Sequence, residues 1–215
     1  MHPDIVKLCA RTDLGLAPHY AALWAMVHGL EAKRVFEFGA GGSTRVILDA
    51  LPEDGVLISN STDSRRGYCD RFGFTELPPP HGRWLHLQCL SEDVPAALFG
   101  FESLFPALDL VLHDGSHSRD VVFADLSWIL PQVRQFGLVV VHDTQYQRCA
   151  EGMIAAVIHA LVQVERAHDM LFSHTTLPYG AGLTIIRVEK SKWPARQPMR
   201  CKDGDPSGWT RPRSL

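Results

Sequence analysis

The chain alternates short apolar runs with longer segments whose apolar residues recur at helical spacing. A short apolar run bounded by turn residues is typical of a buried strand, and apolar residues repeated on one face are typical of a helix. Five runs are predicted to be strands: residues 34–39, 55–60, 84–89, 108–113 and 136–141. The predicted helices are residues 20–30, 43–51, 63–72, 92–99, a helix whose buried positions run from 121 to 129, and 151–167.

This alternation predicts an α/β fold with a mainly parallel sheet covered by helices on both faces. Two further runs, Leu171–His174 and Leu183–Val188, flank the turn residues Pro178, Tyr179 and Gly180. We expect these runs to close the sheet as an antiparallel pair. The predicted fold class is therefore a doubly wound, mostly parallel seven-stranded sheet with an antiparallel last strand.

The chain length is that of one domain, which we place at residues 1–190, with residues 1–31 as a helical N-terminal part. Residues 191–215 hold four prolines, six Lys or Arg, two Asp and few aliphatic residues. That composition predicts a tail or extended arm. Its charge of +4 leaves −7 for the rest, because the whole chain carries −3. We expect the tail to be dispensable for the core fold. The alternative is that its positive charge docks it on the acidic body or on a partner subunit, and a homo-oligomer is a possible assembly.

Composition narrows the function classes. A net charge of −3 argues against a nucleic-acid partner. The five cysteines are scattered, odd in number and not in metal-type pairs, which favours reduced thiols in the cytoplasm. The first residues lack a basic region followed by an apolar one, so no signal peptide is expected. No apolar run is long enough to span a membrane.

The segment from Arg34 to Thr44 reads as a buried strand, a glycine turn and a helix start. Its glycines permit a tight turn and leave room for a ligand against the backbone. Ser43 or Thr44 can cap the following helix. Strand, glycine turn and helix together are how doubly wound proteins hold nucleotide-like cofactors. The spacing alone is a weak signal, because glycines after an apolar run often mark only a turn.

Polar side chains collect where the predicted parallel strands end, which is where ligands bind in an open α/β sheet. They are Glu37; Asn60 and Ser61; Cys89 and Ser91; His113, Asp114 and His117; and His142 and Asp143. We expect His113 to be structural, because it ends an apolar strand. The alternative is that strand ends are polar because they face solvent.

Two motifs resemble a known family. Residues 37–44, Glu-Phe-Gly-Ala-Gly-Gly-Ser-Thr, resemble the cofactor loop of class I S-adenosylmethionine-dependent methyltransferases. Residues 114–117, then Asp125, Leu126 and Trp128, then residues 137–144, are similar to a branch of small-molecule O-methyltransferases related to cephalosporin-biosynthesis and macrolide-sugar enzymes. The resemblance covers about residues 20–188 and implies a Rossmann-like methyltransferase fold.

The resemblance implies roles for the cofactor residues. The loop residues Gly39, Ala40, Gly41 and Ser43 would cradle the methionine part of S-adenosylmethionine, and Glu37 would approach its ammonium. The ribose would lie at Asn60 or Ser61, where the family normally has an acid. Cys89 to Ser91 would lie near the adenine, and Asp114 would lie beside the cofactor.

The resemblance also implies a metal site. In relatives with a metal, acids at the ends of strands four and five bind magnesium, and Asp114, His142 and Asp143 occupy those places. His142 stands where the branch usually has an acid, so another divalent ion, two ligands only, or no metal are alternatives. His117 is the best candidate for the base. If His142 does not bind a metal, it is an imidazole that supports the ligands or a catalytic imidazole, and His142 and Asp143 are counted with His117 as the candidate catalytic residues. His174 and Tyr179 are expected near the acceptor pocket.

The expected activity is methylation of a hydroxyl on a small molecule or sugar, with or without a divalent metal. One alternative is an NADP-dependent oxidoreductase, since Arg65 and Arg66 follow the second strand. Against it, Thr44 replaces the third glycine of the dinucleotide motif. The other alternative is a methyltransferase-like binding or scaffold protein without catalysis, which the missing acid at Asn60 and the altered metal position would fit.

Overall fold

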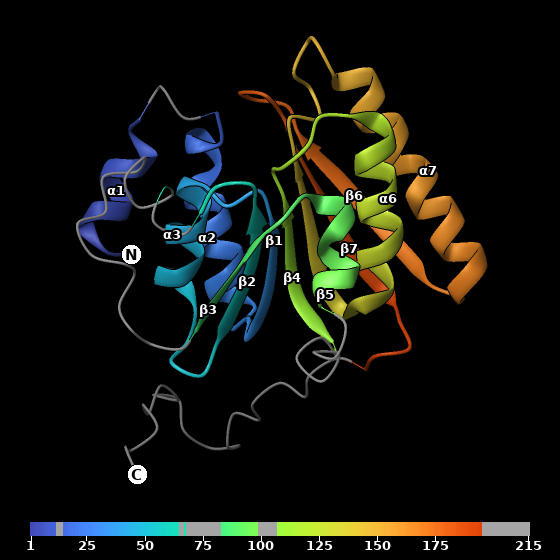
Figure 1. The fold of residues 1–215 in the computed structure, drawn as a ribbon, viewed down its shortest axis with the longest axis horizontal. Helices are drawn as coiled ribbons and strands as arrows, with labels where there is room; N and C mark the ends of the chain where they lie inside the picture. Colours follow the sequence, from blue (N-terminus) through green and yellow to red (C-terminus); the bar gives the residue numbers. More distant parts are fainter. Residues whose placement is uncertain (12–14, 65–66, 68–82, 99–106, 195–215) are drawn as a thin grey trace, which may run out of the picture.

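The computed structural model describes residues 1–11, 15–64, 67, 83–98 and 107–194. They form one seven-stranded sheet in the order β3-β2-β1-β4-β5-β7-β6 (Figure 1). The first five strands are parallel, and β7 pairs antiparallel with both β5 and β6. The predicted α/β class, doubly wound sheet and antiparallel last strand are confirmed. The strands are β1 Arg34–Phe38, β2 Val56–Ser61, β3 Trp84–Gln88, β4 Leu108–His113, β5 Val133–His142, β6 Leu171–Leu177 and β7 Leu183–Lys190.

Helices cover both faces of the sheet, and the core has two halves. The described helices are α1 Pro3–Cys9, η1 Ala17–His19, α2 Tyr20–Gly29, α3 Gly42–Ala50, η2 Ser91–Asp93, α5 Val94–Ala97, α6 Arg119–Ile129, η4 Leu130–Gln132 and α7 Ala150–His168. In β1, Val35 packs with α1, α2 and α3, whereas Phe36 and Phe38 pack with α6 and α7. Successive side chains of a strand point to opposite faces, so every residue of a run can be apolar when both faces are covered.

The winding of the sheet reverses between β1 and β4. From β1 the chain proceeds outward to β2 and β3, and it then returns to β4 on the other side of β1. The backbone N–H of Asp114 donates to the carbonyl of Phe38 at 2.9 Å, which holds the two strand ends together. The carboxyl ends of β1 and β4 are therefore the place where an open α/β sheet binds its ligand.

A buried ion pair connects the amino ends of β1, β4 and β5. The carboxylate of Asp109 pairs with the Arg134 guanidinium and accepts hydrogen bonds from the backbone N–H groups of Lys33, at 2.6 Å, and Arg34, at 2.8 Å. Asp109 is fully buried. Because a buried carboxylate is costly unless paired and hydrogen-bonded, these contacts explain an acid inside the apolar β4.

Several predicted elements differ in length, and one cannot be compared. Strands β6 and β7 end at Leu177 and Lys190, past the predicted ends at His174 and Val188. Strand β5 begins at Val133 instead of 136, because Val133 already pairs with Leu108 before an irregularity in the register. The helix predicted over 92–99 is a short η2 followed by α5. The helix predicted over 63–72 lies largely outside the described residues.

The beginning of the predicted tail contacts the sheet. Ser191 Oγ donates to the Val133 carbonyl at 2.8 Å, and the carbonyl of Trp193 accepts from the backbone N–H of Gln135 at 2.8 Å. The indole N–H of Trp193 donates to the Pro131 carbonyl at 3.2 Å. Most of the predicted tail lies outside the described residues, so its boundary at 190 stays a prediction. Of the helices described, none has the length and apolarity needed to cross a membrane.

Candidate active site

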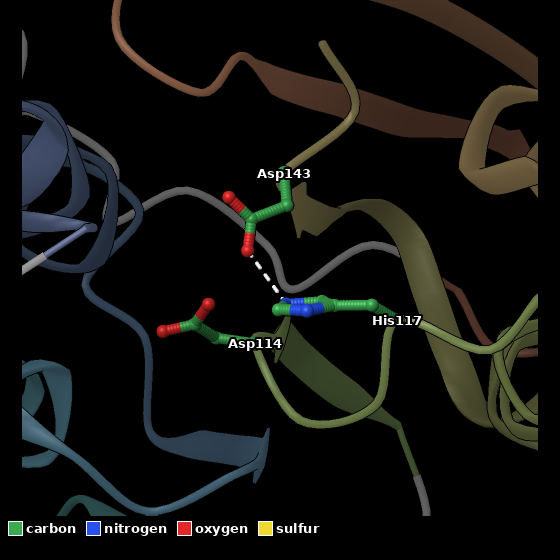
Figure 2. Close-up of side chains that lie close together, drawn as sticks. All are labelled: Asp114, His117 and Asp143. Atoms are coloured by element: carbon green, nitrogen blue, oxygen red, sulfur yellow. Dashed lines mark ion pairs between the residues drawn. The ribbon is translucent and has the colours of Figure 1, made fainter. Parts of the chain in front are cut away.

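The ends of β4 and β5 bring together Asp114, His117 and Asp143, as Figure 2 shows. One potential ligand atom from each residue lies within 4.8 Å of the other two. His117 Nε2 lies 2.6 Å from Asp143 Oδ2. The His117 side chain is 48% exposed and that of Asp143 is 12% exposed. The imidazole is thus held at Nε2 by a carboxylate, and about half of the side chain is open to solvent.

His142 lies behind this group. Its Nδ1 is 2.9 Å from Asp114 Oδ1 and 3.3 Å from Asp143 Oδ2, and its side chain is almost fully buried. Burial lowers the pKa of His142, but the hydrogen bonds to the two carboxylates and their charges outweigh burial and raise the pKa to about 9. Burial alone would raise the pKa of Asp143, but the His142 hydrogen bond and the charges of His142 and His117 lower it. His142 therefore links two carboxylates that would otherwise repel each other.

The predicted metal ligands are arranged differently from the expectation. Asp114 and Asp143 belong to the group that could hold an ion, but its third member is His117, which the sequence suggested as a base. His142 contacts the same carboxylates from the buried side. In metal sites, an imidazole that hydrogen-bonds a ligating carboxylate fixes the orientation of that ligand. The donor set of two carboxylates and one imidazole fits a divalent ion.

A third histidine, His19, contacts the buried side of the site and was not predicted. It comes from η1, is fully buried, and its ring is 5.6 Å from the His142 ring and 4.5 Å from the Tyr179 ring. Burial and then the charge of His142 lower the pKa of His19, against a smaller opposite effect of the Tyr179 backbone. Within the described residues, both ring nitrogens of His19 and Nε2 of His142 lack a well-formed hydrogen bond. Three such buried nitrogens together favour an ordered water or a ligand group between them.

The turn between β6 and β7 covers this histidine. Tyr179 OH lies 3.4 Å from the Pro18 carbonyl, which it contacts as a donor. Gly180 has a φ of +64°, and a Cβ there would lie 3.3 Å from His19 Nε2. Tyr179, expected near the acceptor pocket, thus lies over the buried part of the site. His174 is exposed on the edge strand β6, and no described contact connects it to the site.

Glu37 lies inside the protein under the glycine loop. Its two carboxylate oxygens accept hydrogen bonds from Ser43 Oγ at 2.6 Å and Thr44 Oγ1 at 2.7 Å. Thr44 Oγ1 also accepts from the Gly41 N–H at 3.0 Å. Burial raises the pKa of Glu37 to about 8, although the two hydroxyl donors act in the opposite direction. Glu37 and Ser43, both predicted to meet the cofactor, are here the internal support of the loop.

Gly39 is required by a close backbone approach. Its φ is +87°, and a Cβ at this position would lie 2.7 Å from the Cα of Gly115 and closer still to the Asp114 carbonyl oxygen. The backbone N–H groups of Gly39 and Ala40 donate to the Asn60 carbonyl at 3.1 and 3.0 Å. The loop is thereby fixed between the ends of β2 and β4. Gly41, in extended conformation, is the residue before α3.

The ends of β2 and β3 lie beside the loop. Asn60 is buried and its Nδ2 donates to the Cys89 carbonyl at 3.3 Å, whereas its Oδ1 is buried without a partner among the described residues. Ser61 Oγ lies 3.1 Å from His86 Nε2. Cys89 is a partly buried free thiol whose pKa is raised by burial and then by Asp93, and Ser91 begins η2. Asn60, Ser61 and Cys89 therefore share one corner of the crevice.

His113 is structural, as its place in an apolar strand suggested. Its Nε2 lies 3.0 Å from Asp125 Oδ2, and both side chains are buried. The ring also contacts Phe38, with ring centroids 5.1 Å apart. This pair connects α6 to the end of β4 and so positions the loop that carries Asp114 and His117.

Residues 36–144 match the family model described as a methyltransferase domain. No curated protein sequence matches the chain. Among solved structures, the O-methyltransferase TomG from Streptomyces achromogenes, involved in tomaymycin synthesis and solved with S-adenosylmethionine, has a TM-score of 0.62 and 17% identity over 88% of this chain and 91% of that one.

Two further solved structures share the fold. The Bacillus cereus O-methyltransferase, solved with S-adenosylhomocysteine, has a TM-score of 0.64 and 12% identity over 86% of this chain and 89% of that one. MycE from the mycinamycin pathway, solved with magnesium, S-adenosylhomocysteine and mycinamycin VI, has a TM-score of 0.58 and 18% identity. That match covers 95% of this chain and 57% of the MycE chain. At these identities the likenesses establish the shared fold.

Proposed function

This chain belongs to the methyltransferase-domain family, and on that premise we propose that it transfers a methyl group from S-adenosylmethionine to a hydroxyl oxygen of a small molecule or sugar. The single observation that carries the choice of oxygen is the group of Asp114, His117 and Asp143 at the ends of β4 and β5. A hydroxyl must lose its proton on methylation, and this group is built to receive it.

Asn60 supports binding of the nucleoside part of the cofactor. Its Oδ1 is a buried acceptor without a partner among the described residues, at the strand end where the family holds the ribose. A ribose hydroxyl is a donor that would satisfy this atom, because buried acceptors without a partner are costly. Gly39 and Ala40, fixed to the Asn60 carbonyl, present the adjoining backbone.

His117 is proposed as the proton acceptor and Asp143 as the group that orients it. S-adenosylmethionine supplies a methyl group on a positively charged sulfur, whose bond to carbon breaks as the oxygen–carbon bond forms. With Nε2 of His117 held by Asp143, the other ring nitrogen is available for the hydroxyl proton. The proton removed from the acceptor is then shared within the His117–Asp143 pair and released to solvent through the exposed edge of the ring.

A divalent cation is a proposed component of the same group. Asp114, Asp143 and His117 would be its ligands, and a bound cation lowers the pKa of a coordinated hydroxyl. The ring nitrogen of His117 that would bind the cation would carry no proton, so that nitrogen would not serve as the base while the cation is bound. His142 would keep both carboxylates in place from the buried side. The nitrogen ligand favours a transition metal over magnesium.

Calorimetry with S-adenosylmethionine and S-adenosylhomocysteine tests the proposal first. Gly41→Val places a branched side chain at the start of α3, where the ligand needs backbone, and binding should be lost while the thermal unfolding stays cooperative. Equal affinity in both proteins would contradict the site assignment. Methylation is then assayed on hydroxyl acceptors, such as sugars and phenols, with EDTA and with added manganese or magnesium.

The proposal of a non-catalytic binding protein has one observation in its favour. Glu37 and Ser43 hydrogen-bond each other in the interior instead of facing the crevice. Binding of S-adenosylmethionine without methylation of any acceptor, under all metal conditions, would favour that alternative. The three described cysteines, Cys9, Cys89 and Cys149, are free thiols, which supports the cytoplasm as the proposed location.

A further inference from the structure

A polar cavity of about 360 Å³ is lined by residues at the beginnings of α6 and α7. The side chains that give it its charge are Arg119, Arg148 and Glu151. Arg119 is the first residue of α6, and Arg148 and Glu151 lie on either side of the start of α7. Figure 1 shows that α6 and α7 begin at the same edge of the sheet, where β4 and β5 end.

Both loops that carry the active-site group lead directly into this cavity. Arg119 follows His117 by two residues on the loop after β4. On the loop after β5, the Cys149 thiol lies 3.8 Å from the Asp143 carbonyl oxygen, and Cys149 lines the cavity. A Cβ at Gly152 would lie 3.6 Å from Arg119 Cβ, so the two helices are in close contact here. A small molecule bound at His117 and Asp143 therefore has this cavity beside it.

Within the part of the chain that the structure describes, neither of the two arginines has a carboxylate partner. Arg119 donates from Nη2 to His159 Nδ1 at 3.3 Å, and Arg148 and Glu151 make no ion pair among the described residues. By contrast, Arg45 pairs with Asp4 and Arg134 pairs with Asp109. The cavity thus holds two guanidinium groups and one carboxylate, and its net charge is positive.

We propose that this cavity binds a negatively charged group of the methyl acceptor, a carboxylate or a phosphate, so that the acceptor is an anionic hydroxyl compound. The inference rests on the proposed function, because it assumes an acceptor at His117. Arginine is suited to the task, since its planar fork of N–H donors matches the oxygens of carboxylates and phosphates. The Glu151 carboxylate repels a bound anion and lowers the affinity of the cavity for it.

The test compares charged and neutral probes of the same shape. Inorganic phosphate, D-glucuronate and glucose 6-phosphate are titrated into the full chain, with D-glucose as the neutral control, and binding is followed by NMR. We expect at least one of the charged probes to bind and D-glucose to bind more weakly. Glucuronate and glucose 6-phosphate distinguish a carboxylate from a phosphate as the preferred group.

Charge variants then assign the binding to the cavity. Arg119→Gln and Arg148→Gln should each weaken binding of the anionic probe about fivefold. This factor corresponds to the upper end of the free energies of solvent-exposed ion pairs. Glu151→Gln should tighten it, because it removes the repelling carboxylate. Arg187→Gln, on the exposed face of β7, is the matched control and should leave binding unchanged.

The outcomes separate this inference from the proposed function. One outcome is that S-adenosylmethionine binds while no charged probe binds the wild type more tightly than it binds Arg119→Gln and Arg148→Gln. That result would contradict the anion site and leave the methyltransferase proposal unaffected. Equal weakening by Arg187→Gln, or no tightening by Glu151→Gln, would also overturn it. If S-adenosylmethionine does not bind while the charged probes still respond to the variants as expected, the site stands and the proposed function fails.

Discussion

The contact of His142 with two carboxylates predicts a stability that depends on pH in a specific direction. In the folded chain the pKa of His142 is about 9, against 6.5 for the free side chain. A raised pKa of a cationic group stabilises the folded state fully below the unfolded value, and that stability is lost as the pH rises through the folded value. At about 1.4 kcal/mol per pKa unit, the difference between the two values corresponds to about 3 kcal/mol.

The perturbation is His142→Gln, measured by urea unfolding with EDTA present so that no metal contributes. We expect the variant to be less stable than the wild type at pH 6, and the gap in the free energy of unfolding to shrink by about 3 kcal/mol between pH 6 and pH 9.5. The quantity to compare is the difference in unfolding free energy between wild type and variant, and how that difference changes with pH. Burial also raises the pKa of Glu37 to about 8, so both proteins lose stability between its free value of 4.5 and 8.

A matched control is His174→Gln, since His174 is exposed on β6. It should show no pH-dependent gap. A gap for His142→Gln that stays constant within about 1 kcal/mol, or widens as the pH rises, would refute the ion-pair arrangement. The same result would remove the argument that His142 fixes Asp114 and Asp143 for a metal or for His117.

Three other predictions follow from the same contacts. Gly39→Ala should cost about 2 kcal/mol of unfolding free energy through its positive φ and the clash with the β4 loop, whereas Gly29→Ala, with open space around it, should cost nothing. If activity needs a metal, Asp143→Asn should lose most of the metal-dependent rate in a methylation assay while calorimetry shows unchanged cofactor affinity; retention of that rate would contradict ligation. Truncation after Pro194 should leave the unfolding free energy unchanged, whereas truncation after Lys190 should lower it by about 2 kcal/mol. Only the shorter chain loses the hydrogen bonds from Ser191 and Trp193 to β5 and η4. Identical unfolding curves for the two truncated chains would contradict this prediction.

The order and type of the elements followed from the sequence, because the pattern of apolar residues is a local property. In β1 and β4 apolar residues follow one another directly, as Val35 and Phe36 do and as Leu110 to Leu112 do, and this is typical of a strand covered on both faces. The glycine loop was also predictable, since a strand that runs directly into glycines and a helix start has few alternatives. The reversal of winding then placed the residues after β1, β4 and β5 at one edge of the sheet.

Which side chains meet at that edge was decided only by the tertiary structure. His117 follows β4 and His142 ends β5, and both reach Asp143, but His117 lies on the exposed side and His142 on the buried side. Sequence spacing cannot distinguish these sides, because the backbone turn after each strand sets where the side chain lies; Asp143 itself has a φ of +57°.

The same limit explains the residues that were missed or placed differently. His19 joins the site from a segment more than a hundred residues away in the chain from His142, and only the packing of η1 against the β6–β7 turn brings it there. The sequence placed Glu37 and Ser43 at the glycine loop, but their mutual hydrogen bond depends on how α3 packs on β1. Local patterns specify elements and the edge where they end, whereas contacts between distant residues depend on the packing of the whole sheet.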